Sequence, residues 1–261
     1  MHVRGKRICL SVLIGFLLPV SLLPAGRRAL ADESPSKSVV QLIVWKIQIA
    51  GYDTMYMQAA AGTGFFISSG GLAITNSHVV DLARRRPATY KVLAVHGGEF
   101  YGARIVCSSS LPPAVNGSVA PSRDVAEVQL APPDIPLDEI GHGGRYRARA
   151  HRGPLPVFPA LTTGPLPAIG DPVRVLGFGH RSENSLPFEW SVTGAVREYD
   201  QAADGTPLIL LKFDRDVEPG HSGSPVLDAK SEVVGVLTWS KHTDPSIGVA
   251  ISRDALDPAC P

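Results

Sequence analysis

The chain has 261 residues, of which 44% are hydrophobic and 19% charged, and its formal net charge is +1. This length and composition suit one large all-β domain with a substantial core, because barrels of such length often form a single unit. The near-neutral charge gives no electrostatic reason to expect a nucleic-acid partner.

The N-terminus has the features of an export signal. Three basic residues precede an apolar run over residues 8–23, and the small residues Ala29 and Ala31 suit cleavage before Asp32. An uncleaved membrane anchor is the alternative, but two prolines interrupt the run, which is short for a spanning helix of about 20 apolar residues. We therefore expect a signal peptide over residues 1–31 and export of residues 32–261 to the periplasm or the extracellular space, without stable membrane insertion.

The three cysteines leave one question open. Cys9 belongs to the predicted signal, so Cys107 and Cys260 remain in the mature chain. An exported chain could pair them, but two cysteines are not a disulfide framework.

Short β-type runs bounded by Gly, Pro, Ser and Asp recur along the chain, whereas helical periodicity is scarce. Strands are predicted in the first half at residues 39–44, 64–67 and 72–75. Strands are predicted in the second half at residues 172–177, 190–196, 208–213 and 233–239.

A segment rich in Pro, Gly and Arg separates these two sets of strands. It extends over residues 131–166 and is interpreted as a long connection. The sequence therefore predicts a first barrel at about residues 37–130 and a second barrel at about residues 167–252.

Residues 73–80 (AITNSHVV) end a predicted hairpin and contain His78. Alone, a histidine in such a place is usually a capped or half-buried residue.

A second segment, residues 122–128 (SRDVAEV), contains Asp124. This aspartate would lie on the same face of a strand as the small and apolar Ala126 and Val128. If that face is inward, the buried carboxylate needs a partner to offset its desolvation, and His78 would supply one. A surface aspartate that closes a turn is the alternative.

The third segment, residues 219–226 (PGHSGSPV), places Ser222 beside glycines. Glycines let the backbone turn tightly, so the amides of Gly220 and Ser222 could both point at one spot and form an oxyanion hole. By itself the segment could also be a plain turn before a strand at Pro225.

Together the three segments, in the order His, Asp, Ser, resemble the trypsin-like (chymotrypsin-fold) serine peptidases from about Gln41 to Ser252. Residues 73–80 are similar to that family's alanine-to-histidine motif almost residue for residue. Residues 220–226 are closer to bacterial members, namely the glutamyl endopeptidases and, more loosely, the high-temperature-requirement proteases.

The resemblance implies an all-β fold of two six-stranded antiparallel β-barrels with the active site in the cleft between them. It also implies a secreted serine endopeptidase with the triad His78, Asp124 and Ser222, which cuts protein or peptide substrates through an acyl-enzyme intermediate. Animal members often place an aspartate just before the serine, where a newly cut N-terminus pairs with it. Here that position is His221, so this activation mechanism is not expected.

The same resemblance locates a specificity pocket. Asp216 stands six residues before Ser222, at the expected floor, and an acidic floor would favour Arg or Lys before the scissile bond. A structural role for this carboxylate, with preference for a small or medium apolar residue, is the competing interpretation. The walls and the substrate-pairing edge are expected from Thr238, Trp239, Ser240 and Gly248.

Other enzyme classes fit less well. An α/β-hydrolase needs Gly-x-Ser-x-Gly, but Ser224 occupies the last position, and a zinc peptidase needs a His-Glu-x-x-His motif that does not occur. No cofactor and no metal are therefore expected. The remaining alternative is a catalytically silent, protease-like binding module. The sequence does not indicate the oligomeric state.

Overall fold

The computed structural model describes residues 34–50, 53–111, 122–134, 149–179, 188–241 and 243–256. The chain divides into two units, Met1–Asp32 and Glu33–Pro261. The predicted signal peptide falls in the first unit and lies outside the described residues, as do Cys9 and Cys260. The third cysteine, Cys107, is part of a disulfide.

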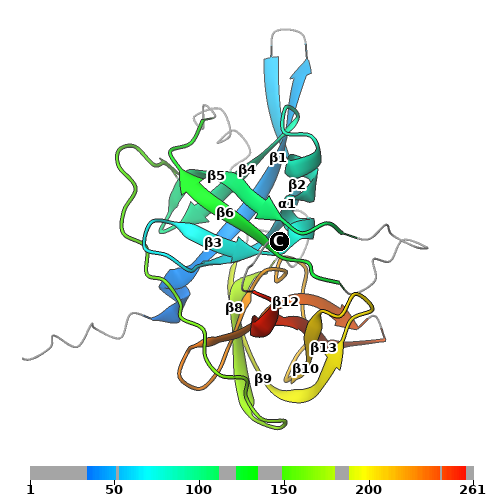
Figure 1. Ribbon diagram of the computed structural model, residues 1–261. Helices are drawn as coiled ribbons and strands as arrows, with labels where there is room; N and C mark the ends of the chain where they lie inside the picture. Colours follow the sequence, from blue (N-terminus) through cyan, green and yellow to red (C-terminus); the bar gives the residue numbers. More distant parts are fainter. Residues whose placement is uncertain are drawn as a thin grey trace, which may run out of the picture. The chain divides into compact units, whose positions relative to one another are not determined.

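Six antiparallel strands close the first barrel, in the order β4-β1-β2-β3-β6-β5, and β4 pairs with β5 to complete it (Figure 1). Strands β1 to β3 pair in chain order, as do β4 to β6, and the pairs β1–β4 and β3–β6 join these two sets. The strands are β1 (Val39–Ala50), β2 (Asp53–Phe66), β3 (Leu72–Thr75), β4 (Tyr90–His96), β5 (Glu99–Ser108) and β6 (Ala126–Ala131). A short β7 (Arg149–Ala150) adds to β5 in parallel, and η1 (Pro35–Ser38) precedes β1.

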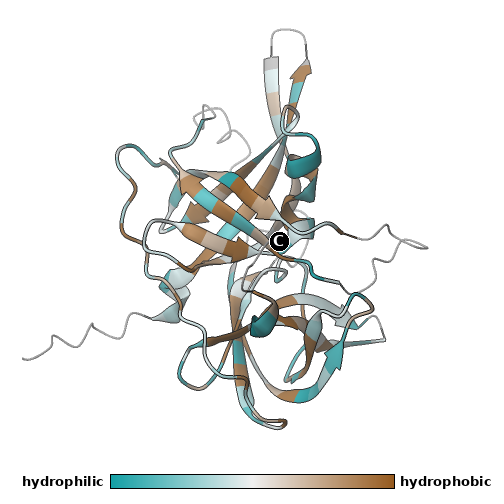
Figure 2. Cartoon of the chain, in the orientation of Figure 1, coloured by the Kyte–Doolittle hydropathy of each residue, from teal (hydrophilic) through white to brown (hydrophobic). Residues whose placement is uncertain are grey.

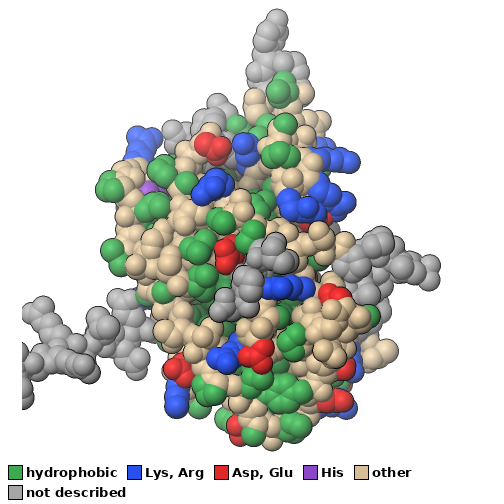
Figure 3. Space-filling model, in the orientation of Figure 1, with side chains coloured by type: hydrophobic (Ala, Val, Ile, Leu, Met, Phe, Trp, Pro, Cys, Tyr) green, Lys and Arg blue, Asp and Glu red, His purple; other side chains and the backbone are tan. Residues whose placement is uncertain are grey.

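An α-helix, α1 (Ser77–Arg85), follows β3 directly. Asp81 forms ion pairs with Arg84 and Arg85. These two basic residues occupy the last turn, where their positive charges interact favourably with the negative end of the helix dipole. In Figure 3 basic side chains gather over this helix. The helix therefore keeps a solvated outer face while Val79 and Val80 are buried beneath it.

The second barrel closes in the order β10-β13-β12-β11-β8-β9. A long connection leads into it from the first barrel, and a short helix, η3 (Arg253–Ala255), follows its last strand. Its strands are β8 (Pro172–Gly179), β9 (Phe188–Gln201), β10 (Pro207–Phe213), β11 (Pro225–Leu227), β12 (Val233–Lys241) and β13 (Asp244–Ser252). The predicted all-β architecture of two six-stranded antiparallel barrels is confirmed, with α1 and the two short helices added to it.

Each barrel has an apolar interior, and hydrophobic residues concentrate on the strands in Figure 2. Phe158 comes from the connection but is buried against Phe66 of the first barrel, with ring centroids 4.4 Å apart. The connection is thus packed onto the first barrel by an aromatic contact. Within the described ranges, no helix is long and apolar enough to cross a membrane.

Candidate active site

His78 and Asp124 are brought together by the pairing of β3 with β6. Thr75 lies opposite Ala126 in this pair, so the residues at the end of β3 and the start of β6 are neighbours. The Nδ1 atom of His78 lies 2.5 Å from Oδ2 of Asp124, and the backbone amide of His78 donates to Oδ1 at 2.9 Å. A carboxylate oxygen can accept a hydrogen bond from Nδ1, and in the tautomer that makes this bond Nε2 has the free lone pair.

The carboxylate of Asp124 is buried, with 1% of the residue exposed. Its two hydrogen bonds from His78 offset the cost of removing a charge from water. The buried Asn76 fixes the surrounding backbone, because its amide donates to the Asp124 carbonyl at 2.7 Å and to the Thr238 hydroxyl at 2.9 Å. Asn76 therefore joins the backbone at Asp124 to β12 of the second barrel.

Ser222 lies in the turn between β10 and β11, next to a glycine that cannot be replaced without strain. Gly223 has φ of +87°, and a Cβ placed on it would lie 2.0 Å from the Thr63 carbonyl oxygen. Its amide donates to the Leu237 carbonyl at 2.9 Å. Glycine thus lets the turn press against β2 and carries Ser222 to the junction of the barrels.

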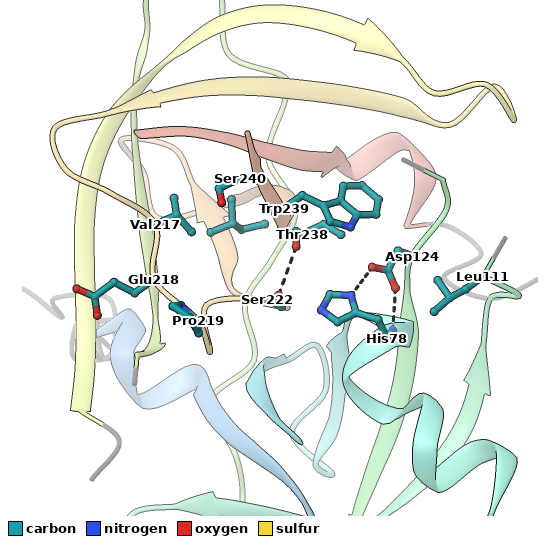
Figure 4. A pocket seen from close by; sticks show the side chains of 11 residues that line it. His78, Leu111, Asp124, Val217, Glu218, Pro219, Ser222, Thr238, Trp239 and Ser240 are labelled. Carbon is teal, nitrogen blue, oxygen red and sulfur yellow. Dashed lines mark hydrogen bonds and ion pairs between the residues drawn. The ribbon is translucent and has the colours of Figure 1, made fainter. Parts of the chain in front are cut away.

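The hydroxyl of Ser222 donates to the Thr238 carbonyl at 3.3 Å, and in the part of the chain that is described it is not bonded to His78. Figure 4 shows the imidazole edge of His78 facing Ser222, with Asp124 on the other side of the ring. The structure therefore brings the three predicted catalytic residues into one pocket, with the serine side chain turned toward β12.

The turn before the serine contains Gly220, which has φ of +97°. The amide of His221 donates to the Glu218 carbonyl at 3.4 Å across this turn, and the Thr63 hydroxyl donates to the Gly220 carbonyl at 2.9 Å. The amides of Gly220 and Ser222 donate to no protein acceptor among the described residues. Neither predicted oxyanion-hole amide is therefore bonded to another described part of the chain.

The pocket has a volume of about 500 Å³. Its walls come from both barrels and include three of the predicted substrate-binding residues, Thr238, Trp239 and Ser240. Eleven residues line it: His78, Leu111, Asp124, Val217, Glu218, Pro219, Ser222, Leu237, Thr238, Trp239 and Ser240.

Two predicted substrate-binding residues do not line this pocket. Asp216 is exposed, and the chain enters the pocket one residue later, at Val217, whose amide donates to the Pro245 carbonyl at 3.0 Å. Gly248 faces the barrel interior, where a Cβ would lie 2.4 Å from Cε2 of Phe213. Besides Asp124, the acidic residue in the lining is Glu218, and Figure 4 shows its side chain directed away from Ser222.

Sequence reasoning missed the residues that connect the elements of the site. Asn76 lies within residues 73–80, but that motif predicts a role only for His78. The sequence predicts no role for Thr63 or Leu111. The hydrogen bonds of Asn76 and Thr63 join residues far away in the chain, so a local pattern carries no signal for them. Within the described ranges, no group of three or more His, Cys, Asp or Glu residues is placed to hold a metal ion.

Residues 62–236 match the family model of the trypsin-like peptidase domain, which covers more than half of the chain. The chain belongs to this family. It is 28% identical over 201 residues to HhoB of Synechocystis sp., named as a serine protease, covering 74% of this chain and 38% of that protein. It is 24% identical over 184 residues to a DegP-like protein of Chlamydia trachomatis, named as a probable periplasmic serine endoprotease, covering 69% of this chain and 28% of that protein.

This family member spans less than half the length of the curated relatives it matches. Its fold is similar to the crystal structure of the Rv3671c protease of M. tuberculosis in its active form. That match has a TM-score of 0.55 and 20% identity, and it covers 86% of this chain and 80% of the other.

Proposed function

We propose that this chain is an exported serine endopeptidase in which Ser222 is the nucleophile, His78 the general base and Asp124 the residue that orients it. The observation that carries the proposal is the 2.5 Å contact between His78 Nδ1 and Asp124 Oδ2 in the pocket that also contains Ser222. A carboxylate bound to Nδ1 selects the tautomer whose Nε2 can accept a proton.

The reaction begins when the serine hydroxyl rotates from the Thr238 carbonyl toward His78 Nε2, a change between staggered rotamers. Ser222 Oγ then attacks the scissile carbonyl carbon as its proton passes to Nε2. His78 gives that proton to the departing amine. The acyl half of the substrate then remains bound to Ser222 Oγ as an ester, the acyl-enzyme. Water repeats the sequence, attacking the ester while His78 accepts its proton, and Ser222 is regenerated.

The oxyanion formed in each half of the reaction would be bound by the amides of Gly220 and Ser222. Donors fixed before the reaction stabilise this charge without reorganising, and removal of one such donor typically costs about 10²- to 10³-fold in kcat. The unengaged state of both amides among the described residues supports this role.

The pocket beside Ser222 favours a small or medium apolar side chain before the scissile bond. Val217 and Leu237 contribute aliphatic walls, whereas Asp216 is exposed outside the lining. A cationic side chain buried there would lose hydration, because Asp216 lies outside the lining and the Glu218 carboxylate is directed away from Ser222. This proposal replaces the preference for Arg or Lys expected from the position of Asp216 in the sequence.

The substrate is a protein or peptide, and the chemistry needs neither metal nor cofactor. Export rests on the predicted signal over residues 1–31, and the periplasmic designation of the C. trachomatis relative supports it.

A fluorophosphonate probe tests the mechanism, because it reacts only with a serine that an assembled triad activates. Wild type should be labelled at Ser222 and should hydrolyse peptides, and Ser222→Ala should do neither while remaining folded. Ser224→Ala is the matched control, since Ser224 is buried two residues away and does not line the pocket. An unlabelled, folded wild type would indicate the silent binding module.

A further inference from the structure

His221 is fully buried immediately before Ser222, whereas histidine in general is intermediate between the buried and the exposed residue types. It does not line the pocket, so it cannot touch a substrate bound there. The proposed catalytic cycle gives it no chemical task. One of its contacts lies within the turn that presents the predicted oxyanion-hole amides, and another lies with β9.

The first contact is a hydrogen bond between the two ends of this turn. The backbone amide of Glu218 donates to Nδ1 of His221 at 2.9 Å. A backbone N–H is always the donor, so Nδ1 must hold a lone pair. The imidazole is therefore neutral, with its proton on Nε2.

The same two residues are also joined by a backbone bond, from the His221 amide to the Glu218 carbonyl, but its length is 3.4 Å. That distance is well beyond the usual 2.9–3.0 Å of an N–H···O bond. The turn around Pro219 and Gly220 is therefore closed mainly by the imidazole. Its closure determines where the amide of Gly220 points.

The second contact holds the imidazole itself. The ring stacks on the indole of Trp190 in β9, with centroids 3.5 Å apart and planes 25° apart. The guanidinium of Arg215 lies 5.5 Å from the centroid of the same indole. Trp190 is buried within the second barrel, so the stack fixes the histidine to a rigid strand.

We propose that His221 is a positioning residue for the oxyanion hole: as a neutral acceptor clamped on Trp190, it closes the Glu218–His221 turn and aims the amide of Gly220. This inference rests on the peptidase activity proposed above. It assigns to a buried imidazole the task of shaping the turn from inside the barrel.

Two substitutions at this position separate the two contacts. His221→Phe keeps an aromatic ring for Trp190 but removes the acceptor. His221→Asn loses the ring but keeps an acceptor, because its Oδ1 is as many bonds from the backbone as Nδ1. The Phe variant should lose about 10²-fold in kcat with little change in KM, as when one oxyanion donor is lost, and the Asn variant should recover most of that loss.

Inhibitor binding makes the assignment specific. A peptide aldehyde forms a tetrahedral adduct whose oxygen occupies the oxyanion hole, so its affinity should fall in His221→Phe in parallel with kcat. A reduced-bond peptide (–CH₂–NH– at the scissile position) has no such oxygen and should bind wild type and variant equally. Equal losses for both ligands would indicate general damage to the site and would overturn the assignment.

A measurement that needs no activity separates this inference from the proposed function. In Ser222→Ala, ¹⁵N NMR of His221 should show an unprotonated Nδ1 and a protonated Nε2; a proton on Nδ1 would refute the acceptor role. If wild type neither labels nor hydrolyses while His221 has the expected tautomer, the peptidase proposal fails alone. If wild type is active and a folded His221→Phe keeps full kcat, the inference fails alone.

Discussion

The backbone amide of Thr63 donates a 2.8 Å hydrogen bond to the carbonyl oxygen of Ser222, so β2 of the first barrel is bonded directly to the proposed nucleophile of the second. The Thr63 hydroxyl extends this link. It donates to the Gly220 carbonyl at 2.9 Å and accepts from the Phe178 amide at 2.9 Å. One buried threonine thus ties the serine, the oxyanion turn and β8 together.

The first prediction follows from that hydroxyl. Thr63→Val keeps the shape but leaves the Phe178 amide without this acceptor, and a buried unsatisfied group costs about 1–3 kcal/mol. The free energy of unfolding from urea titration should fall by this amount, and kcat should fall with it. Thr63→Ser keeps the hydroxyl and is the matched control. A valine variant as stable and active as the serine variant would contradict the linking role.

The second prediction concerns Gly223. Gly223→Ala would force a left-handed φ on a residue with a Cβ and place that Cβ 2.0 Å from the Thr63 carbonyl oxygen. We expect a large loss of stability and of probe labelling at Ser222. Gly98→Ala is the control, because Gly98 also has positive φ, at +76°, but open space around it. Similar melting temperatures for the two variants would show that the contact with Thr63 does not matter.

The third prediction tests Asp124. Asp124→Asn should fold normally, but its amide can stabilise the wrong tautomer of His78 and cannot stabilise the imidazolium. By analogy with the triad template of this same family, kcat should fall by about 10⁴-fold. Stopped assays with an ester or peptide substrate would measure it. A loss of less than tenfold would remove Asp124 from the triad.

The fourth prediction concerns the pH dependence of stability, which an ion pair outside the pocket should shape. His151 Nδ1 lies 2.8 Å from Glu99 Oε2, and His151 Nε2 lies 2.9 Å from the Pro154 carbonyl oxygen. The hydrogen bond with Glu99 raises the pKa of His151, and the same bond lowers the pKa of Glu99. This pair fastens the connection after β7 to β5.

The sign follows from linkage. The contribution of His151 is complete below its ordinary pKa of 6.5 and is lost as pH rises through its raised folded-state pKa. The contribution of Glu99 is complete above its ordinary pKa of 4.5 and is lost as pH falls through its lowered folded-state pKa. The difference in unfolding free energy between wild type and His151→Asn should therefore be largest between pH 4.5 and 6.5. A difference that does not vary with pH would show that the pair is not ionic.

The fold was predictable wherever apolar alternation and turn residues recur locally. The runs at residues 172–177 and 208–213 lie within β8 and β10, and the interval between Leu72 and His78 contains β3 and the start of α1. The sequence pattern does not predict β4 or β5 as strands, because only part of each has a clear apolar alternation. The long connection gave no sign that Phe158 would enter the first core.

The pairing of His78 with Asp124 could be anticipated from strand parity and from motif order. The contacts between the barrels could not. The bonds from Thr63 to Ser222 and from Asn76 to Thr238 join residues 159 and 162 positions apart, and no local pattern encodes such distances. Asp216 was expected in the pocket from its spacing alone, but the turn of the chain at Val217 decides which side chain enters.

The last prediction is the residue preference that this turn creates. Val217 and Leu237 give the pocket aliphatic walls, so wild type should cleave peptide libraries mainly after residues such as Ala, Val or Leu. Val217→Ala removes two methyl groups from the wall and should shift the preference toward larger apolar residues. Because a methylene in such a pocket is worth only about 1–3 kcal/mol, the expected shift is about 10- to 200-fold in relative kcat/KM.

Asp216→Ser is the control for this prediction, since the exposed carboxylate lies outside the lining and its loss should leave the profile unchanged. Cleavage after Arg or Lys that disappears in Asp216→Ser would restore the acidic floor and refute the apolar pocket, while the triad assignment would stand.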